Sequence, residues 1–166
     1  GGQIGGNLAL LCAQKELGDV VIYDIPSAEG MIKGKALDIS QLCPMDGYDS
    51  KIIGTSDPKD IANSDVVIIT AGIPRKPGMN REDLLKINIK IITDVANNVK
   101  KYAPNAFVIV LSNPIDAIVY SFYKVSGFSK RKVVGMAGVL DSTRFKTFIA
   151  METGASVQDI DCMVLG

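Results

Sequence analysis

The sequence has no histidine in 166 residues, and its charges balance, with 18 Lys plus Arg against 18 Asp plus Glu. Without histidine, general acid–base chemistry near neutral pH needs a group from elsewhere. A nucleic-acid surface needs a basic excess, so no nucleic-acid partner is expected. No apolar run approaches the roughly 18 residues of a membrane span, and no signal peptide is visible, so no membrane partner is expected.

The cysteines are few and scattered. Cys12, Cys43 and Cys162 are odd in number and far apart in the chain. This spacing fits neither a disulfide framework nor a zinc site, so we expect no bound metal. The three residues are predicted to be buried thiols in a reducing compartment, which favours the cytoplasm.

Hydrophobic residues make up 47% of the chain and charged residues 22%, which is typical of one globular domain. Apolar runs at 19–24, 51–54, 66–70, 106–111, 133–134 and 162–165 predict strands, and their continuity predicts parallel strands buried on both faces. Helical patterns lie between them, at 82–102 and at 115–125, the latter between Pro114 and Gly127. The alternation predicts an open doubly wound parallel α/β sheet.

The first residues suggest a phosphate-binding turn. Gly2 and Gly5 directly precede a helical pattern, and glycines there let the backbone approach a diphosphate at the helix N-terminus. Asp24 ends the next strand, where an acid binds the ribose hydroxyls of a dinucleotide. A carboxylate there repels a 2′-phosphate, so NAD is favoured over NADP. The alternative for Asp24 is an ordinary residue at the turn after a strand.

The loop after the run 66–70 has two arginines, Arg75 and Arg81, with Pro74, Pro77 and Gly78 nearby. Planar guanidinium groups bind carboxylates through two parallel hydrogen bonds. The loop therefore predicts a site for a small molecule with two anionic or carbonyl oxygen centres. The alternative is a solvated lid with incidental charges.

Together these segments resemble the lactate/malate dehydrogenase family, and in particular the NAD-dependent malate dehydrogenases of its lactate-dehydrogenase-like branch. The resemblance rests on the motifs at 2–5, 21–24, 34–38, 70–72, 75–79, 112–116 and 135–144. It implies a Rossmann-type doubly wound parallel sheet that lacks its first strand. Residues 1–166 would then be an incomplete NAD-binding domain, ending at the junction with an absent C-terminal substrate domain.

The resemblance also implies roles for substrate-site residues. Arg75 would bind the distal carboxylate of a dicarboxylate, Arg81 would polarise the carbonyl that is reduced, and Arg144 would hold the reacting carboxylate. Asn113 would contact the substrate and the nicotinamide ribose. Asp141 would orient a catalytic histidine that this chain does not contain, so the chain by itself is expected to be inactive.

The cofactor implied by the resemblance is NAD. The contacts carried over to this sequence are Gly2, Gln3, Ile4, Gly5, Asp24, Thr70, Ala71, Gly72, Asn88, Leu111, Ser112 and Asn113.

The implied activity is the reversible NAD-dependent oxidation of (S)-malate to oxaloacetate, a step of the tricarboxylic acid cycle. A homodimer or homotetramer is expected at full length, with the segment 34–43 at the subunit interface. One alternative is an L-lactate dehydrogenase, which Arg75 disfavours because a guanidinium facing a methyl group in a closed site is costly. A second alternative is a non-catalytic NAD-binding module. An NAD-dependent glycosidase would need metal-binding Cys and His residues, which are not found with suitable spacing.

Overall fold

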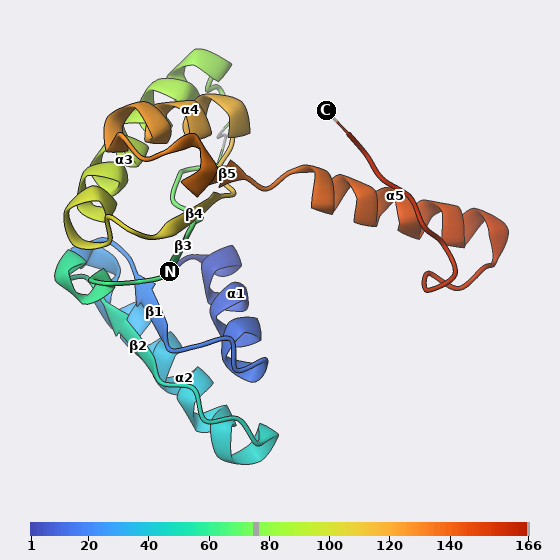
Figure 1. Cartoon of the computed structure of the whole chain (residues 1–166), viewed down its shortest axis with the longest axis horizontal. Helices are drawn as coiled ribbons and strands as arrows, with labels where there is room; N and C mark the ends of the chain where they lie inside the picture. Colours follow the sequence, from blue (N-terminus) through green and yellow to red (C-terminus); the bar gives the residue numbers. More distant parts are fainter. Residues whose placement is uncertain (75–76, 166) are drawn as a thin grey trace.

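The computed structural model describes residues 1–74 and 77–165, and for Arg81 the backbone alone. Within this part there are five α-helices and five strands, which alternate along the chain except that only a 3-10 turn separates the second strand from the third (Figure 1). The helices are α1 (Gln3–Gln14), α2 (Glu29–Asp46), α3 (Arg81–Tyr102), α4 (Ile115–Ser126) and α5 (Gly138–Thr153). The strands are β1 (Val20–Tyr23), β2 (Ile52–Thr55), β3 (Val66–Ile69), β4 (Phe107–Val110) and β5 (Val133–Gly135). Short 3-10 turns lie at Pro26–Ala28, Pro58–Ile61 and Lys130–Lys132.

All strand pairs in the described residues are parallel, as predicted. β1 pairs with β2 in one sheet, and β3, β4 and β5 form a second sheet in that order. The helices α2, α3 and α4 connect the strands that pair with each other and make the crossovers that parallel pairing requires. The Rossmann-type α/β fold is therefore confirmed, although the described strands form two sheets rather than one continuous sheet.

β1 contributes to both hydrophobic clusters of the domain. Its residues Val20 and Ile22 pack with α1 and α2, whereas Val21 and Tyr23 pack against the cluster formed by α3, α4 and the second sheet. This alternation follows from the strand period of two, which sends successive side chains to opposite faces. β1 is thus a strand with apolar contacts on both faces, as predicted.

The prediction that the strands are buried on both faces is wrong for β3. Ile69 is 3% exposed and packs in the cluster with α3 and α4, but Val66 is 52% exposed and Ile68 37%. The alternation sends Val66 and Ile68 to the opposite face of the strand, away from that cluster. A continuous apolar run therefore does not establish burial on both faces here.

The helices α3 and α4 begin and end at residues whose types explain the boundaries. Asn80 accepts a hydrogen bond from the Asp83 amide, and the Asp83 carboxylate accepts one from the Asn80 amide, which makes a capping box at the start of α3. Pro114 precedes α4, and Gly127 ends it with φ of 71°. Both predicted helices are confirmed, and they are packed together over the second sheet (Figure 1).

The predicted strand at 162–165 is wrong. These residues lie beside α5, where the Val164 amide donates to Ser142 Oγ at 2.9 Å and the Cys162 thiol contacts the Ser142 carbonyl oxygen at 3.5 Å. The Ser142 contacts hold the segment as an extended tail rather than in a sheet, and α5 itself extends away from both sheets (Figure 1).

The cysteine prediction is correct only in part. Cys12, Cys43 and Cys162 are free, but each is half-buried rather than buried. Among the described residues, no helix is both long and apolar enough to cross a membrane.

Candidate functional site

The start of α1 presents unpaired backbone donors. Gly2 is its N-cap, without a side-chain cap, and the first intrahelical bond runs from the Gly6 amide to the Gly2 carbonyl oxygen at 2.9 Å. The amides of Gln3, Ile4 and Gly5 precede this bond and so have no acceptor within the helix. Backbone donors and the positive end of the helix dipole together favour an anion at this position.

Gly1 admits no side chain in this packing, and Gly5 has room only for a tight contact. A methyl group on Gly1 would lie 2.2 Å from Ile32 and 2.8 Å from Asp24 Oδ2, and one on Gly5 would lie 3.1 Å from Thr70 Oγ1. The absence of side chains therefore lets the start of α1 approach the carboxyl ends of β1 and β3. Gly5 and Thr70, both predicted cofactor contacts, are brought together in this way.

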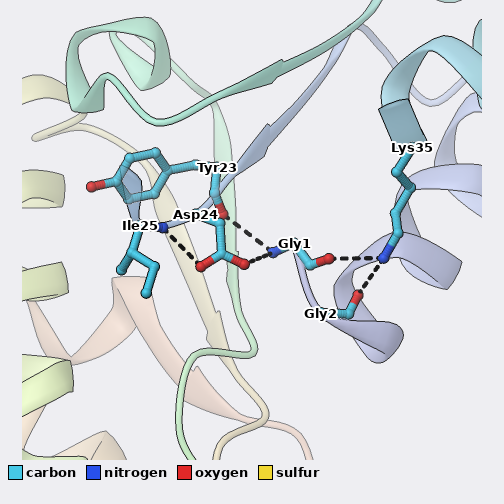
Figure 2. A network of polar contacts seen from close by, with 6 residues as sticks. All are labelled: Gly1, Gly2, Tyr23, Asp24, Ile25 and Lys35. Atoms are coloured by element: carbon cyan, nitrogen blue, oxygen red, sulfur yellow. Dashed lines mark hydrogen bonds and ion pairs between the residues drawn. The ribbon is translucent and has the colours of Figure 1, made fainter. Parts of the chain in front are cut away.

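Asp24 lies directly after β1, beside the glycine turn (Figure 2). Its Oδ1 accepts a hydrogen bond from the Ile25 amide at 2.8 Å, and its Oδ2 lies 3.2 Å from the Gly1 nitrogen. The same nitrogen lies 3.2 Å from the Tyr23 carbonyl oxygen. The carboxylate is thus fixed by backbone groups while its side chain remains 27% exposed, so it can accept further hydrogen bonds from a ligand.

Tyr23, the neighbour of Asp24, has a raised pKa. Burial disfavours the phenolate, and the negative charges of Asp24 and Asp57 disfavour it further, whereas a hydrogen bond from Asn98 opposes the shift. The phenol stays neutral at physiological pH and accepts a hydrogen bond from Asn98 Nδ2 at 3.4 Å.

Lys35 also reaches the glycine turn, from α2 (Figure 2). Its Nζ lies 2.8 Å from the Gly1 carbonyl oxygen and 3.2 Å from that of Gly2. Lys35 falls within a motif of the family resemblance but is not among the site residues predicted from the sequence. The available signal is Gly6, a glycine inside a helix, which indicates close approach by another segment.

The loops after β3 and β4 are connected by side-chain hydrogen bonds. Ser112 Oγ donates to the Ala71 carbonyl oxygen at 2.6 Å. Asn88, 3% exposed, accepts from the Ile73 amide at 2.9 Å and donates from Nδ2 to the Asn113 carbonyl oxygen at 3.0 Å. Asn88 and Ser112, both predicted cofactor contacts, therefore hold these two loops together at the carboxyl end of the second sheet.

The remaining predicted cofactor contacts lie in the same two loops. Thr70 and Gly72 follow β3, and Gly72 has φ of 154°, a value that favours glycine. Leu111 follows β4, and its amide donates to the Ile69 carbonyl oxygen at 2.9 Å. All predicted cofactor residues thus lie in the first turn of α1, at the carboxyl ends of β1, β3 and β4, or on α3.

Unlike the predicted cofactor residues, the arginines and Asp141 predicted for the substrate site are not all brought together by the described residues. Arg75 lies outside the described residues, and Arg81 is the first residue of α3, with its side chain outside the described part. Asp141 and Arg144 are one turn apart on α5 and form an ion pair, with Arg144 Nη1 3.2 Å from Asp141 Oδ1. Both side chains are exposed, on a helix that extends away from the sheets (Figure 1).

The described arrangement fits a dinucleotide. It combines backbone donors at a helix N-terminus for a diphosphate with a carboxylate for ribose hydroxyls, at the carboxyl ends of parallel strands. No cluster of metal-binding side chains occurs among residues 1–74 and 77–165.

Comparison with known proteins agrees with this geometry. Residues 1–135 match the NAD-binding domain of the lactate/malate dehydrogenases. The chain is 64% identical to a malate dehydrogenase from Myxococcus xanthus and 59% identical to one from Geobacter sulfurreducens, in each case over all of its residues. It covers 53% and 52% of those two proteins, so it spans about half the length of the curated relatives it matches.

The solved structures that resemble this chain include both malate dehydrogenases and lactate dehydrogenases. Cryptosporidium parvum malate dehydrogenase matches with a TM-score of 0.93 and 51% identity, over 99% of this chain and 52% of that one. Cryptosporidium parvum lactate dehydrogenase, complexed with lactic acid and nicotinamide adenine dinucleotide, matches with a TM-score of 0.91 and 54% identity. This second match covers 98% of this chain and 51% of the other.

Proposed function

The chain belongs to the lactate/malate dehydrogenase family, and we propose that the protein containing it is an NAD-dependent malate dehydrogenase. The observation that supports this most directly is the identity with malate dehydrogenases along the whole chain. The proposed reaction is the reversible oxidation of (S)-malate to oxaloacetate. Since the chain covers only half of those relatives, substrate and activity are proposed for the full-length protein.

The cofactor would bind along the carboxyl ends of the strands. The first-turn amides of α1, beginning at Gln3, would bind the diphosphate, and Asp24 would accept hydrogen bonds from the adenosine ribose. Thr70 and Asn113 would lie along the rest of the dinucleotide. When bound, NAD supplies the hydride acceptor for malate oxidation. The negative charge of Asp24 would disfavour a 2′-phosphate, so the proposal specifies NAD rather than NADP.

The substrate would be bound by three arginines. Arg75 would pair with the distal carboxylate, Arg144 with the carboxylate next to the reacting carbon, and Arg81 with the carbonyl oxygen. Arg81 would contribute most as negative charge develops on that oxygen. Asp141 would orient the catalytic histidine, which would come from outside this chain.

An L-lactate dehydrogenase is the nearest alternative, because structures of both kinds resemble this fold closely. Arg75 favours malate. A guanidinium without a carboxylate partner in a closed site would be poorly solvated, whereas a dicarboxylate would pair with it.

Steady-state NADH oxidation by the full-length protein tests the assignment, with oxaloacetate and with pyruvate as substrates. We expect a strong preference for oxaloacetate in the native protein and a weakened or reversed preference in Arg75→Gln. Equal rates, or a preference for pyruvate in the native protein, would refute the malate assignment. NADH binding without turnover of either substrate would instead favour a non-catalytic NAD-binding module.

The full-length protein is further proposed to be a cytoplasmic homodimer or homotetramer. The three free cysteines fit a reducing compartment. The helix α2 exposes Met31, Leu37 and Met45, apolar side chains that a second subunit could cover. Sedimentation of the full-length protein tests this: a monomer at micromolar concentration would contradict it.

A further inference from the structure

Lys35 contacts two successive peptide groups of the glycine turn. Its Nζ lies 2.8 Å from the carbonyl oxygen of Gly1 and 3.2 Å from that of Gly2 (Figure 2). An ammonium group has three donors and no acceptor, so it can bind both oxygens at once. Hydrogen bonds from a charged donor are stronger than those between neutral groups.

Each of these peptide groups has its N–H end at the start of α1. The Gly1 carbonyl belongs to the peptide that carries the Gly2 amide, and the Gly2 carbonyl to the peptide that carries the Gln3 amide. In a planar peptide the C=O and N–H groups point in opposite directions. An ammonium at the oxygen end therefore fixes the plane of the peptide and makes its N–H a stronger donor, because successive hydrogen bonds polarise one another.

Gly6 provides the space through which the Lys35 side chain reaches the turn. A methyl group on Gly6 would lie 2.5 Å from Lys35 Cδ and 2.8 Å from its Nζ. Both are too close for non-bonded atoms, so any side chain at this position displaces the ammonium. Gly6 is buried within α1, where alanine would otherwise be the better helix former.

We propose that Lys35 is a positioning residue for the diphosphate of the dinucleotide. It acts from the opposite side of the glycine turn: it polarises the peptide that carries the Gln3 amide, the first of the amides that face the anion, and it holds the preceding peptide in place. Gly6 is required to admit it. The proposal rests on the proposed NAD site and adds a residue on α2 to it.

The first test measures binding of NADH, ADP-ribose and adenosine to the full-length protein by calorimetry. In Lys35→Ala we expect NADH and ADP-ribose to bind about tenfold more weakly, the cost of losing a charged hydrogen bond, and adenosine to bind unchanged. Lys33→Ala is the matched control. It removes the same charge from the same helix, but Lys33 is exposed and pairs with Glu29 at 2.6 Å.

The second test is a double-mutant cycle with Gly6→Ala. Gly6→Ala alone should weaken ADP-ribose binding about as much as Lys35→Ala, without lowering the midpoint of thermal unfolding. In the Lys35→Ala background the same substitution should cost nothing further, because the ammonium that it displaces is already gone. Should Lys35→Ala fail to fold, Gly6→Ala against the native protein gives the same readout.

Three outcomes overturn the proposal: equal effects of Lys35→Ala and Lys33→Ala, an equal loss of adenosine binding, or additive effects of Gly6→Ala and Lys35→Ala. They are distinguishable from failure of the NAD site itself. If the native protein binds neither NADH nor ADP-ribose, the proposed function fails first, and the proposal for Lys35 falls with it.

Discussion

Asn88→Asp is expected to loosen the loop after β3 at neutral pH and to do so much less in acid. Asn88 Oδ1 accepts from the Ile73 amide at 2.9 Å, and the substitution keeps an acceptor there. Nδ2 donates to the Asn113 carbonyl oxygen at 3.0 Å and, more weakly, to the Ile73 carbonyl oxygen at 3.4 Å. In the variant a carboxylate oxygen faces both carbonyls, where a donor stood before.

The size of the destabilisation by Asn88→Asp follows from the hydrogen bonds that the variant loses. One net hydrogen bond of about 1 kcal/mol disappears, and a carbonyl oxygen next to a 3% exposed side chain loses its donor, at about 1–3 kcal/mol. We therefore expect the free energy of unfolding to fall by about 2–4 kcal/mol at pH 7.

The pH dependence has a definite sign. Burial and the two facing carbonyl dipoles disfavour the charged form, so the pKa of the introduced carboxyl rises above its ordinary value of about 3.9. Stability is then complete below the unfolded-state pKa and is lost as the pH rises through the folded-state pKa. The protonated carboxyl can donate to Asn113 as the amide did. The variant should therefore resemble the native protein most closely at the acidic end of the range in which the protein stays folded.

Hydrogen exchange followed by mass spectrometry reports on the loop directly. Peptides that contain residues 71–74 should exchange faster in Asn88→Asp, and the difference should shrink as the pH falls, after correction for the intrinsic exchange rate. Asn97→Asp is the control, since Asn97 is exposed on the same helix and undergoes the same chemical change. Equal exchange of residues 71–74 in the two variants would refute the inferred role of Asn88.

Two further substitutions test local contacts. Asn80→Ala removes the capping box of α3 and should lower the free energy of unfolding, measured by urea titration, by about 1 kcal/mol. A change below about 0.2 kcal/mol, roughly a tenth of the largest effects of helix caps, would contradict a stabilising role of the box. Asn98→Ala removes the hydrogen bond that opposes the raised pKa of Tyr23 and should raise that pKa further, measured by ultraviolet titration against Tyr23→Phe. Because the pKa of Tyr23 is raised from 10.0 on folding, its contribution to stability is complete below about pH 10 and is lost as the pH rises through the folded-state value.

Local sequence signals predicted α3 and α4 well, whereas α1 begins at Gln3 and so includes Gly5, which was expected to precede it. Pro114 and Gly127 bound α4 where their backbone preferences place them, and α3 begins one residue before its expected start. The cause of that difference is visible in the sequence, since Asn80 and Asp83 have the spacing of a capping box. The box makes Arg81 the first residue of a helix rather than part of the loop in which it was expected.

Apolar runs predicted the strand positions but not what surrounds them. The run at 162–165 is apolar, yet its amide at Val164 pairs with a serine side chain on α5 instead of a neighbouring strand. Val66 and Ile68 have the composition of a two-faced buried strand, but one face of β3 meets no apolar cluster among the described residues. Whether a strand pairs, and what covers it, depends on segments distant in the chain, which a local pattern does not contain.

In the candidate site, too, the sequence predicted which residues matter but not everything that their side chains contact. Asp24 and Ser112 could be selected from the sequence because they are polar residues at strand ends and in family motifs, whereas Asn88, on α3, was implied only by the family resemblance. In the structure, however, each side chain also binds backbone groups: Asp24 at Ile25, Ser112 at Ala71, and Asn88 on both loops. These residues therefore shape the backbone that would meet the cofactor, whatever direct contact they make with it.

Weakened NAD binding after substitution of Asn88 would not by itself identify a cofactor contact, because displacement of the two loops would produce the same loss. Exchange of the Ile73 amide in the cofactor-free protein separates the two roles, since a side chain that contacts only NAD leaves that amide unaffected.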